Sequence, residues 1–95
     1  RSRGAIAQAN ETTGELQPAD LPVFEALRAM RAELAREQNL PAYVIFHDAT
    51  LRAMAALRPR SLDELARVNG VGAGKLERYG ERVLAVLRAS AGPRP

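Results

Sequence analysis

The chain has 95 residues and carries fourteen basic and eleven acidic side chains, a formal net charge of +3 at pH 7. Its length allows one small domain at most, and the absence of cysteine excludes a disulfide framework and a thiolate metal site. No run of about 18 apolar residues is present to span a membrane, and the single histidine, His47, has no second soft ligand with which to bind zinc.

Residues 1–19 contain Gly4, Gly14 and Pro18 among polar residues and show no sustained helical period. This composition is typical of a flexible linker or a disordered lead-in. Residues 91–95 are expected to form a tail. Because the first residue is arginine, we interpret the chain as a piece of a longer protein.

The first predicted helix runs from Leu21 to Gln38. Asp20 is its predicted cap, and Pro22 suits the first turn, where backbone N–H groups lack intrahelical partners. Apolar residues recur at helical spacing and predict a buried stripe: Val23, Phe24, Leu27, Met30 and Leu34. The charged residues of this helix are expected nearer the solvent: Arg28, Arg31, Glu33, Arg36 and Glu37.

Residues 40–46 are rich in β-branched and aromatic side chains and would suit a strand. No second strand is predicted to pair with them, so we expect a short helical turn that starts at Pro41. A helix capped by Asp48 should follow over residues 49–57 and stop before Pro59. Its predicted inward-facing residues are Leu51, Met54 and Leu57.

Ser61 and Glu64 form a capping-box pattern that opens a further helix through Val68, with Leu62 and Leu65 facing the core. After the glycines of residues 70–74, helical periodicity resumes at Leu76, Tyr79, Val83, Leu84, Val86 and Leu87. Because glycine costs about 1 kcal/mol inside a helix, we expect a break or a kink at Gly80. The predicted fold is all-α, a compact bundle of five or six short helices around one core.

Three glycines at alternate positions, Gly70, Gly72 and Gly74, reverse the chain between two helices. Gly70 and Gly72 can adopt a positive φ or allow another backbone to approach closely. The amides of residues 72–74 would then be free N–H groups at a helix start, able to bind a phosphate oxygen beside the cation of Lys75. This pattern is typical of a helix–hairpin–helix element. The spacing is equally compatible with a tight corner that binds nothing.

Two other glycine motifs are excluded here. A Walker loop needs four residues between its glycines and Ser or Thr after its lysine, whereas three residues separate Gly70 from Gly74 and Leu76 follows Lys75. The dinucleotide fingerprint fails because Lys75 occupies the place of its third glycine. Neither motif would have a preceding strand.

The small positive net charge favours a nucleic-acid partner only weakly. An isoelectric point near 10.2 is one footprint of a nucleic-acid-binding protein. Three of the arginines lie in the two terminal segments, and residues 20–90 carry eleven basic and nine acidic side chains. Any binding surface must therefore be a local patch, and we expect weak affinity.

Two blocks of the sequence, residues 41–51 and 68–80, resemble the HRDC domain, the "helicase and RNase D C-terminal" domain of RecQ-family DNA helicases. The resemblance defines residues 20–90 as the domain, and its Val-Asn-Gly-Val-Gly form is most similar to bacterial RecQ. The chain departs from the pattern at His47, where we expect asparagine. The resemblance implies an accessory domain of a 3′–5′ ATP-dependent helicase in DNA repair and recombination. Such domains typically bind single-stranded or branched DNA and tune substrate preference, while some contact proteins or their own helicase core.

The predicted nucleic-acid-binding residues are Tyr43, Arg58, Arg60, Gly70, Gly72, Gly74, Lys75, Arg78 and Arg82. The resemblance implies an aromatic residue near DNA at Tyr43, which could stack on a base or simply be half-buried. Arg58 and Arg60 could bind phosphates or be ordinary loop charges. Lys75 is the strongest predicted phosphate contact. Arg78 and Arg82 have Glu77 and Glu81 at helical spacing, which could neutralise them, and Tyr79 is expected in the core.

No nucleophile accompanies His47 and Asp48, so we expect neither catalysis nor a cofactor in this domain, while the parent helicase should use ATP and Mg²⁺. The expected partners are single-stranded or branched DNA, and the helicase core or sister HRDC domains of the same chain. We expect a monomer in the bacterial cytoplasm, associated with the nucleoid and not with a membrane. The rival hypothesis is a protein-interaction module with little DNA binding of its own.

Overall fold

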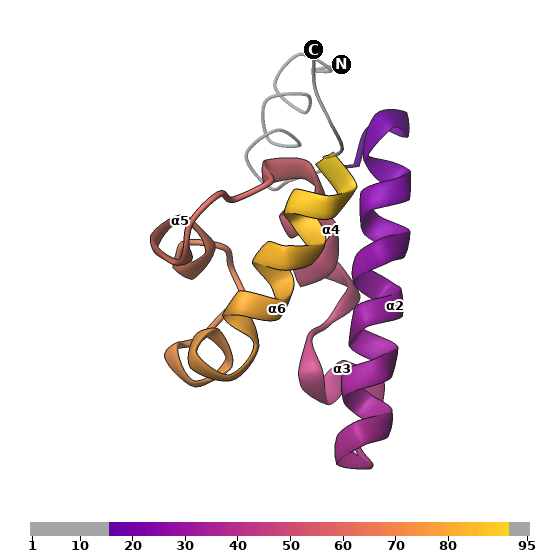
Figure 1. The fold of residues 1–95 in the computed structure, drawn as a ribbon, viewed down its shortest axis with the longest axis vertical. Helices are drawn as coiled ribbons and strands as arrows, with labels where there is room; N and C mark the ends of the chain where they lie inside the picture. The colour runs from indigo at the N-terminus through magenta and orange to yellow at the C-terminus, as the bar shows by residue number, and fades with distance from the viewer. Residues whose placement is uncertain (1–15, 92–95) are drawn as a thin grey trace, which may run out of the picture.

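The computed structural model describes residues 16–91, which fold as helices joined by short loops (Figure 1). A 3₁₀ turn, η1 (Pro18–Asp20), is followed by five α-helices: α2 (Leu21–Gln38), α3 (Ala42–Ile45), α4 (Asp48–Leu57), α5 (Leu62–Ala66) and α6 (Ala73–Ala91). The two long helices, α2 and α6, pack on each other, α3 and α4 pack on α2, and α5 packs on α6. The all-α prediction of five or six helices is confirmed, although α2 and α6 are not short.

The predicted lead-in and tail fall largely outside the described residues. Of the lead-in, only its last residues are described: Leu16 packs against the core and Pro18 opens η1. Of the tail, only Ala91 is described, as the last residue of α6. Within residues 16–91, no helix has the length and apolar character needed to cross a membrane.

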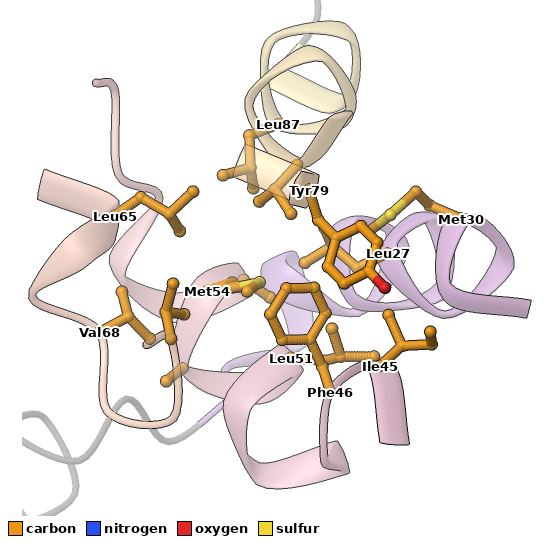
Figure 2. Close-up of a cluster of buried hydrophobic side chains, with 14 of the residues drawn as sticks. Leu27, Met30, Ile45, Phe46, Leu51, Met54, Leu65, Val68, Tyr79 and Leu87 are labelled. Atoms are coloured by element: carbon orange, nitrogen blue, oxygen red, sulfur yellow. The ribbon is translucent and has the colours of Figure 1, made fainter. Parts of the chain in front are cut away.

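Buried apolar side chains from all five α-helices meet in one core (Figure 2). The stripe predicted for α2 is confirmed, with Phe24 only partly buried at its edge. Tyr79 is buried as predicted, and its ring meets that of Phe46 edge-on with the centroids 5.8 Å apart. The other helices contribute Ile45, Leu51, Met54, Leu65, Val83, Leu84 and Leu87. The core thus lies between α2, α4 and α6 and reaches Val68 and Val71 in the loop after α5.

The start of α2 differs from the prediction. The Asp20 carboxylate makes no capping hydrogen bond to α2. It accepts the backbone N–H of Gln17 at 3.0 Å and Arg58 Nη2 at 2.9 Å. The capping prediction is therefore wrong, because these two donors occupy the carboxylate. The other end of α2 stops at Asn39, whose left-handed φ of 61° is typical of a helix C-terminus.

The predicted cap of the next helix is wrong as well. His47 occupies the N-cap position of α4 without a side-chain capping bond, and Asp48 is the first helical residue. The Asp48 Oδ1 atom lies 2.8 Å from Arg31 Nη1. The carboxylate thus binds a side chain seventeen residues away in the sequence and not the amides of its own helix.

Arg31 was predicted to lie toward the solvent, but it is buried, with 8% of its surface exposed. Its Nη1 atom also donates a hydrogen bond to the carbonyl of Phe46 at 2.8 Å. A buried guanidinium needs such partners to offset its lost hydration. Arg31 therefore joins α2 to the loop between α3 and α4, a role that mixed charges on a predicted helix do not reveal.

The Ser61 cap is confirmed in part. Ser61 Oγ accepts the Glu64 N–H at 3.1 Å, whereas the Glu64 carboxylate accepts the N–H of Arg60 and not that of Ser61. The helix ends at Ala66, two residues before the predicted Val68. The first half of the capping box is thus enough to start α5.

Two leucines predicted to face the core are exposed: Leu57 at 51% and Leu62 at 37%. Leu57 follows Leu51 by six residues, so it lies off the face on which Leu51, Met54 and Ala55 recur at helical spacing. Leu62 covers Gly80 from outside the core. A Cβ added to Gly80 would lie 2.7 Å from Leu62 Cδ2.

Helix α6 runs unbroken through Gly80, so the break expected there is not found. The missing Cβ allows α5 to approach α6 closely at this position. The residues that follow, Val83 and Leu84, are buried and hold the helix against the core. Burial of each such side chain contributes about 1.5–3 kcal/mol, which exceeds the cost of one glycine in a helix.

Candidate nucleic-acid interface

The residues between α5 and α6 form the predicted glycine corner. Val68 and Val71 are buried and anchor it to the core, whereas Asn69 and Gly70 between them are exposed. Gly70 has a φ of 99°, and an added Cβ would collide with the Thr50 hydroxyl on α4. Gly70 is therefore required both by the turn and by the close approach of α4.

The corner ends at the N-terminus of α6, where backbone amides lack partners within the helix. The first intrahelical bond runs from the Leu76 N–H to the Gly72 carbonyl at 2.8 Å. The N–H groups of residues 73–75 precede this bond. A Cβ added to Gly72 or Gly74 would meet no atom within 4 Å. Packing among the described residues therefore does not require glycine at these two positions, and an anion has room to approach the amides.

An open depression of about 720 Å³ lies at this corner. Three cations line it, Arg67, Lys75 and Arg78, and no carboxylate is among its lining residues. Within residues 16–91, neither Lys75 nor Arg78 makes an ion pair, so the neutralisation of Arg78 by neighbouring glutamates is not observed. Arg67 lies 3.4 Å from Asp63, but both side chains are more than three-quarters exposed, and such pairs are weak. The free amides thus face a surface of net positive charge.

Lys75 is held in place by the aromatic core beneath it. Its Nζ atom lies 5.7 Å from the centroid of the Phe46 ring, close enough for a cation–π attraction. The Phe46 ring packs against Tyr79, whose hydroxyl donates to Gln38 Oε1 at 3.0 Å. Because the ring beneath it is fixed, the ammonium group of Lys75 is positioned beside the corner.

Tyr43 is the most exposed large side chain of α3, at 62%. Its ring is stacked on that of His47, with the centroids 6.2 Å apart and the planes inclined by 29°. The two residues flank Phe46, the residue that Lys75 overlies, in the short segment from α3 to α4. Tyr43 is therefore free to contact a ligand, although no direct contact joins it to Lys75 among the described residues.

The loop arginines lie at a different depression, lined by Arg58, Pro59, Arg60, Leu84, Leu87 and Arg88. Arg58 is already hydrogen-bonded within the protein, because its guanidinium donates to the Asp20 carboxylate and to the carbonyl of Ala55. Arg60 makes no side-chain ion pair within residues 16–91. The structure thus separates these two candidates from the glycine corner.

Arg82 is also paired with carboxylates of the protein. Its Nη2 atom lies 3.5 Å from Glu33 and 3.7 Å from Glu37, both on α2. This helix, and not the neighbouring Glu81, supplies its carboxylates. Of the nine predicted site residues, the corner brings together Gly70, Gly72, Gly74, Lys75 and Arg78.

Three residues that lie on or beneath this surface are not among the predicted site residues: Arg67, Phe46 and His47. Arg67 could have been found, since it directly precedes the valine–glycine motif. The cation–π contact joins Phe46 to Lys75, which is distant in the sequence, and no local pattern indicates it. The ring contact of His47 with Tyr43 is local, because the two residues are four positions apart, and this spacing was a signal that could have indicated it.

The fold and the corner together define a small all-helical domain with a helix–hairpin–helix-like surface. The model of the HRDC domain family matches residues 20–87. The chain therefore belongs to the HRDC domain family, as its two sequence blocks had indicated.

The relatives agree with this assignment. The structure of HRDC domain 3 of D. radiodurans RecQ superposes with a TM-score of 0.76 at 43% identity, covering 78% of this chain and 97% of that one. The ATP-dependent DNA helicase RecQ of Haemophilus influenzae is 42% identical over 69 residues, which are 73% of this chain and 11% of that protein. The ATP-dependent DNA helicase UvrD2 of Mycobacterium bovis is 37% identical over 103 residues, covering 93% of this chain and 15% of that protein. The chain thus spans a small part of the helicases that it matches.

Proposed function

We propose that this domain binds single-stranded or branched DNA without sequence specificity. The observation that carries the proposal is the corner, where unpaired amides, open space above two glycines, and the cations Lys75 and Arg78 lie together. Amides and cations bind phosphate oxygens, which are the same at every nucleotide, so such a surface selects no base. The exposed ring of Tyr43 adds a stacking surface that tolerates any base.

The relatives support a helicase as the parent protein, since RecQ and UvrD2 are both named ATP-dependent DNA helicases. We propose that the parent is a 3′–5′ helicase that uses ATP and Mg²⁺ in DNA repair and recombination in the bacterial cytoplasm. In that protein this domain would tune which DNA structures are engaged. ATP and Mg²⁺ would bind outside the residues described here.

The test is a titration of a labelled single-stranded oligonucleotide at several salt concentrations, comparing Lys75→Ala with Arg82→Ala. Both variants remove one positive charge from α6. Lys75→Ala should weaken binding to every sequence and reduce the slope of log affinity against log salt by about 0.7, the value for one lost phosphate contact on a single strand.

Arg82→Ala is the matched control. Its guanidinium is already paired with two carboxylates, so its loss should leave the salt slope nearly unchanged. Equal effects of the two variants would mean that net charge, and not the corner, attracts DNA. The proposal would then lose its basis.

A second candidate is a protein-interaction module that docks on the helicase core or on a sister HRDC domain. It is favoured by the near balance of charge over residues 20–90 and by arginines that are already paired, such as Arg58 with Asp20. The same titration separates the two functions. Absence of binding by the unmodified chain at low salt would favour protein docking.

A further inference from the structure

Tyr43 and His47 place two exposed rings against each other on the surface. Tyr43 belongs to α3 and His47 directly precedes α4, and their ring centroids are 6.2 Å apart. The core does not explain this pair, since both residues are exposed while the neighbouring Phe46 is buried. The two rings are thus available to a ligand.

Capping of α4 does not account for a histidine at position 47 either. Residues at the N-cap position commonly accept a hydrogen bond from the helix amides, and Ser, Thr, Asp and Asn are preferred there. The His47 side chain makes no such bond. The His47 ring contacts the ring of Tyr43. His47 therefore acts here through its aromatic ring and not through a capping hydrogen bond.

The surroundings of the pair suit a nucleic acid. Lys75 overlies Phe46, the residue directly before His47 in the sequence, and supplies a cation for a phosphate. The nearest carboxylate in the sequence, Asp48, is bound to Arg31 at 2.8 Å. Its charge is thereby compensated, which limits its repulsion of a DNA backbone that crosses this surface.

We propose that Tyr43 and His47 together form a platform for one unstacked nucleobase, which makes His47 a DNA-binding residue of this domain. The inference rests on the proposed DNA-binding function and deepens it. Bases in a duplex are already stacked on their neighbours, whereas a base in a single strand is free to stack on a protein ring. The platform therefore favours single-stranded DNA, or the single-stranded part of a branched structure, over duplex DNA.

The test uses the whole chain with His47→Asn and two probes of equal length: a labelled oligothymidine and the same strand with abasic sites. Asparagine is among the residues preferred at the N-cap position, which His47 occupies without a side-chain capping bond, so the variant should fold. His47→Asn should weaken binding to oligothymidine by about fivefold, as expected for part of one base-stacking contact, and leave abasic binding unchanged. Tyr43→Ala should show the same dependence on the base with a larger loss.

His47→Phe is the matched control, because it keeps a ring and removes the titratable nitrogens. It should bind oligothymidine like the unmodified chain. An equal loss on both probes for His47→Asn would mean that histidine acts on the phosphates, and no loss on either would mean that it does not touch DNA. Either result overturns the platform.

These outcomes are distinguishable from failure of the proposed function. If the unmodified chain binds oligothymidine through Lys75 but is insensitive to His47→Asn, DNA binding stands and the platform is wrong. If the unmodified chain binds neither probe at low salt, both proposals are wrong.

Discussion

Arg31 connects the interior of the bundle to the candidate interface. It binds the carbonyl of Phe46, and the ring of Phe46 lies under Lys75. It also binds Asp48, and this contact, with smaller contributions from Arg52 and Arg28, holds the pKa of the Asp48 carboxyl below its ordinary value of 3.8. One buried guanidinium thereby fixes the segment that carries both Tyr43 and His47.

The lowered pKa of Asp48 predicts how stability depends on pH. Folding favours the ionised carboxylate, so the stabilisation is complete above the ordinary pKa and is lost as the pH falls through the lowered folded-state pKa. Asp48→Asn should be less stable than the unmodified chain near neutral pH. Because the Asp48 side chain is 58% exposed, solvent screening limits the difference to about 1 kcal/mol.

Urea unfolding of both proteins at neutral pH and between about pH 4 and pH 2 measures this difference in unfolding free energy. The gap between them should narrow below about pH 4, as the carboxylate of the unmodified chain becomes protonated. A gap that stays constant across this range would show that the ion pair with Arg31 does not contribute.

At the scale of elements, the glycine corner combines two different uses of glycine. Gly70 is required by a positive φ and by the contact with Thr50, whereas Gly72 and Gly74 have open space where a side chain would be. The sequence does not show which of the three glycines the turn requires. The backbone conformation and the packing of α4 against the corner separate Gly70 from the other two.

This difference predicts opposite effects of two substitutions. Gly70→Ala should lower the unfolding free energy by about 1–3 kcal/mol from backbone strain alone. The collision of the new methyl group with Thr50 should lower it further. Gly74→Ala lies in the first turn of α6 and should leave stability unchanged or raise it by up to about 1 kcal/mol. The same variant should weaken DNA binding, because its methyl group crowds the free amides.

Thermal unfolding and oligonucleotide titration of both variants check this pair of predictions. A Gly74→Ala variant that binds DNA as tightly as the unmodified chain would remove the backbone amides from the proposed interface. The result for Gly70→Ala tests the description of the turn independently of any ligand.

The helices themselves were largely predictable, because apolar spacing reflects which face is buried. The bounds of α2 and the short turn α3 follow from the sequence, and so does the Ser61 contribution to the start of α5. The roles of Asp20 and Asp48 were not predictable. Their arginine partners lie 38 and 17 residues away in the sequence. A local pattern that fits a helix cap does not show that a distant arginine binds the carboxylate instead.

At the scale of the whole molecule, the predicted site residues divide between separate surfaces. The corner residues are close in sequence and remain together, so their grouping was predictable. Arg58 and Arg82 are bound to carboxylates on η1 and α2, elements that precede them by 38 or more residues. Two of the arginines predicted to contact DNA are thus paired with carboxylates, whereas Lys75 and Arg78 make no ion pair within residues 16–91.

The most direct test of the central claim is an NMR titration that follows each backbone amide as single-stranded DNA is added to the isotope-labelled chain. We expect the largest shifts at Gly72, Ala73, Gly74 and Lys75, with smaller shifts around Tyr43 and His47. Amides of residues 84–88 and of the loop at 58–60 should change little. Shifts confined to that second region, or none at the start of α6, would contradict DNA binding by the glycine corner.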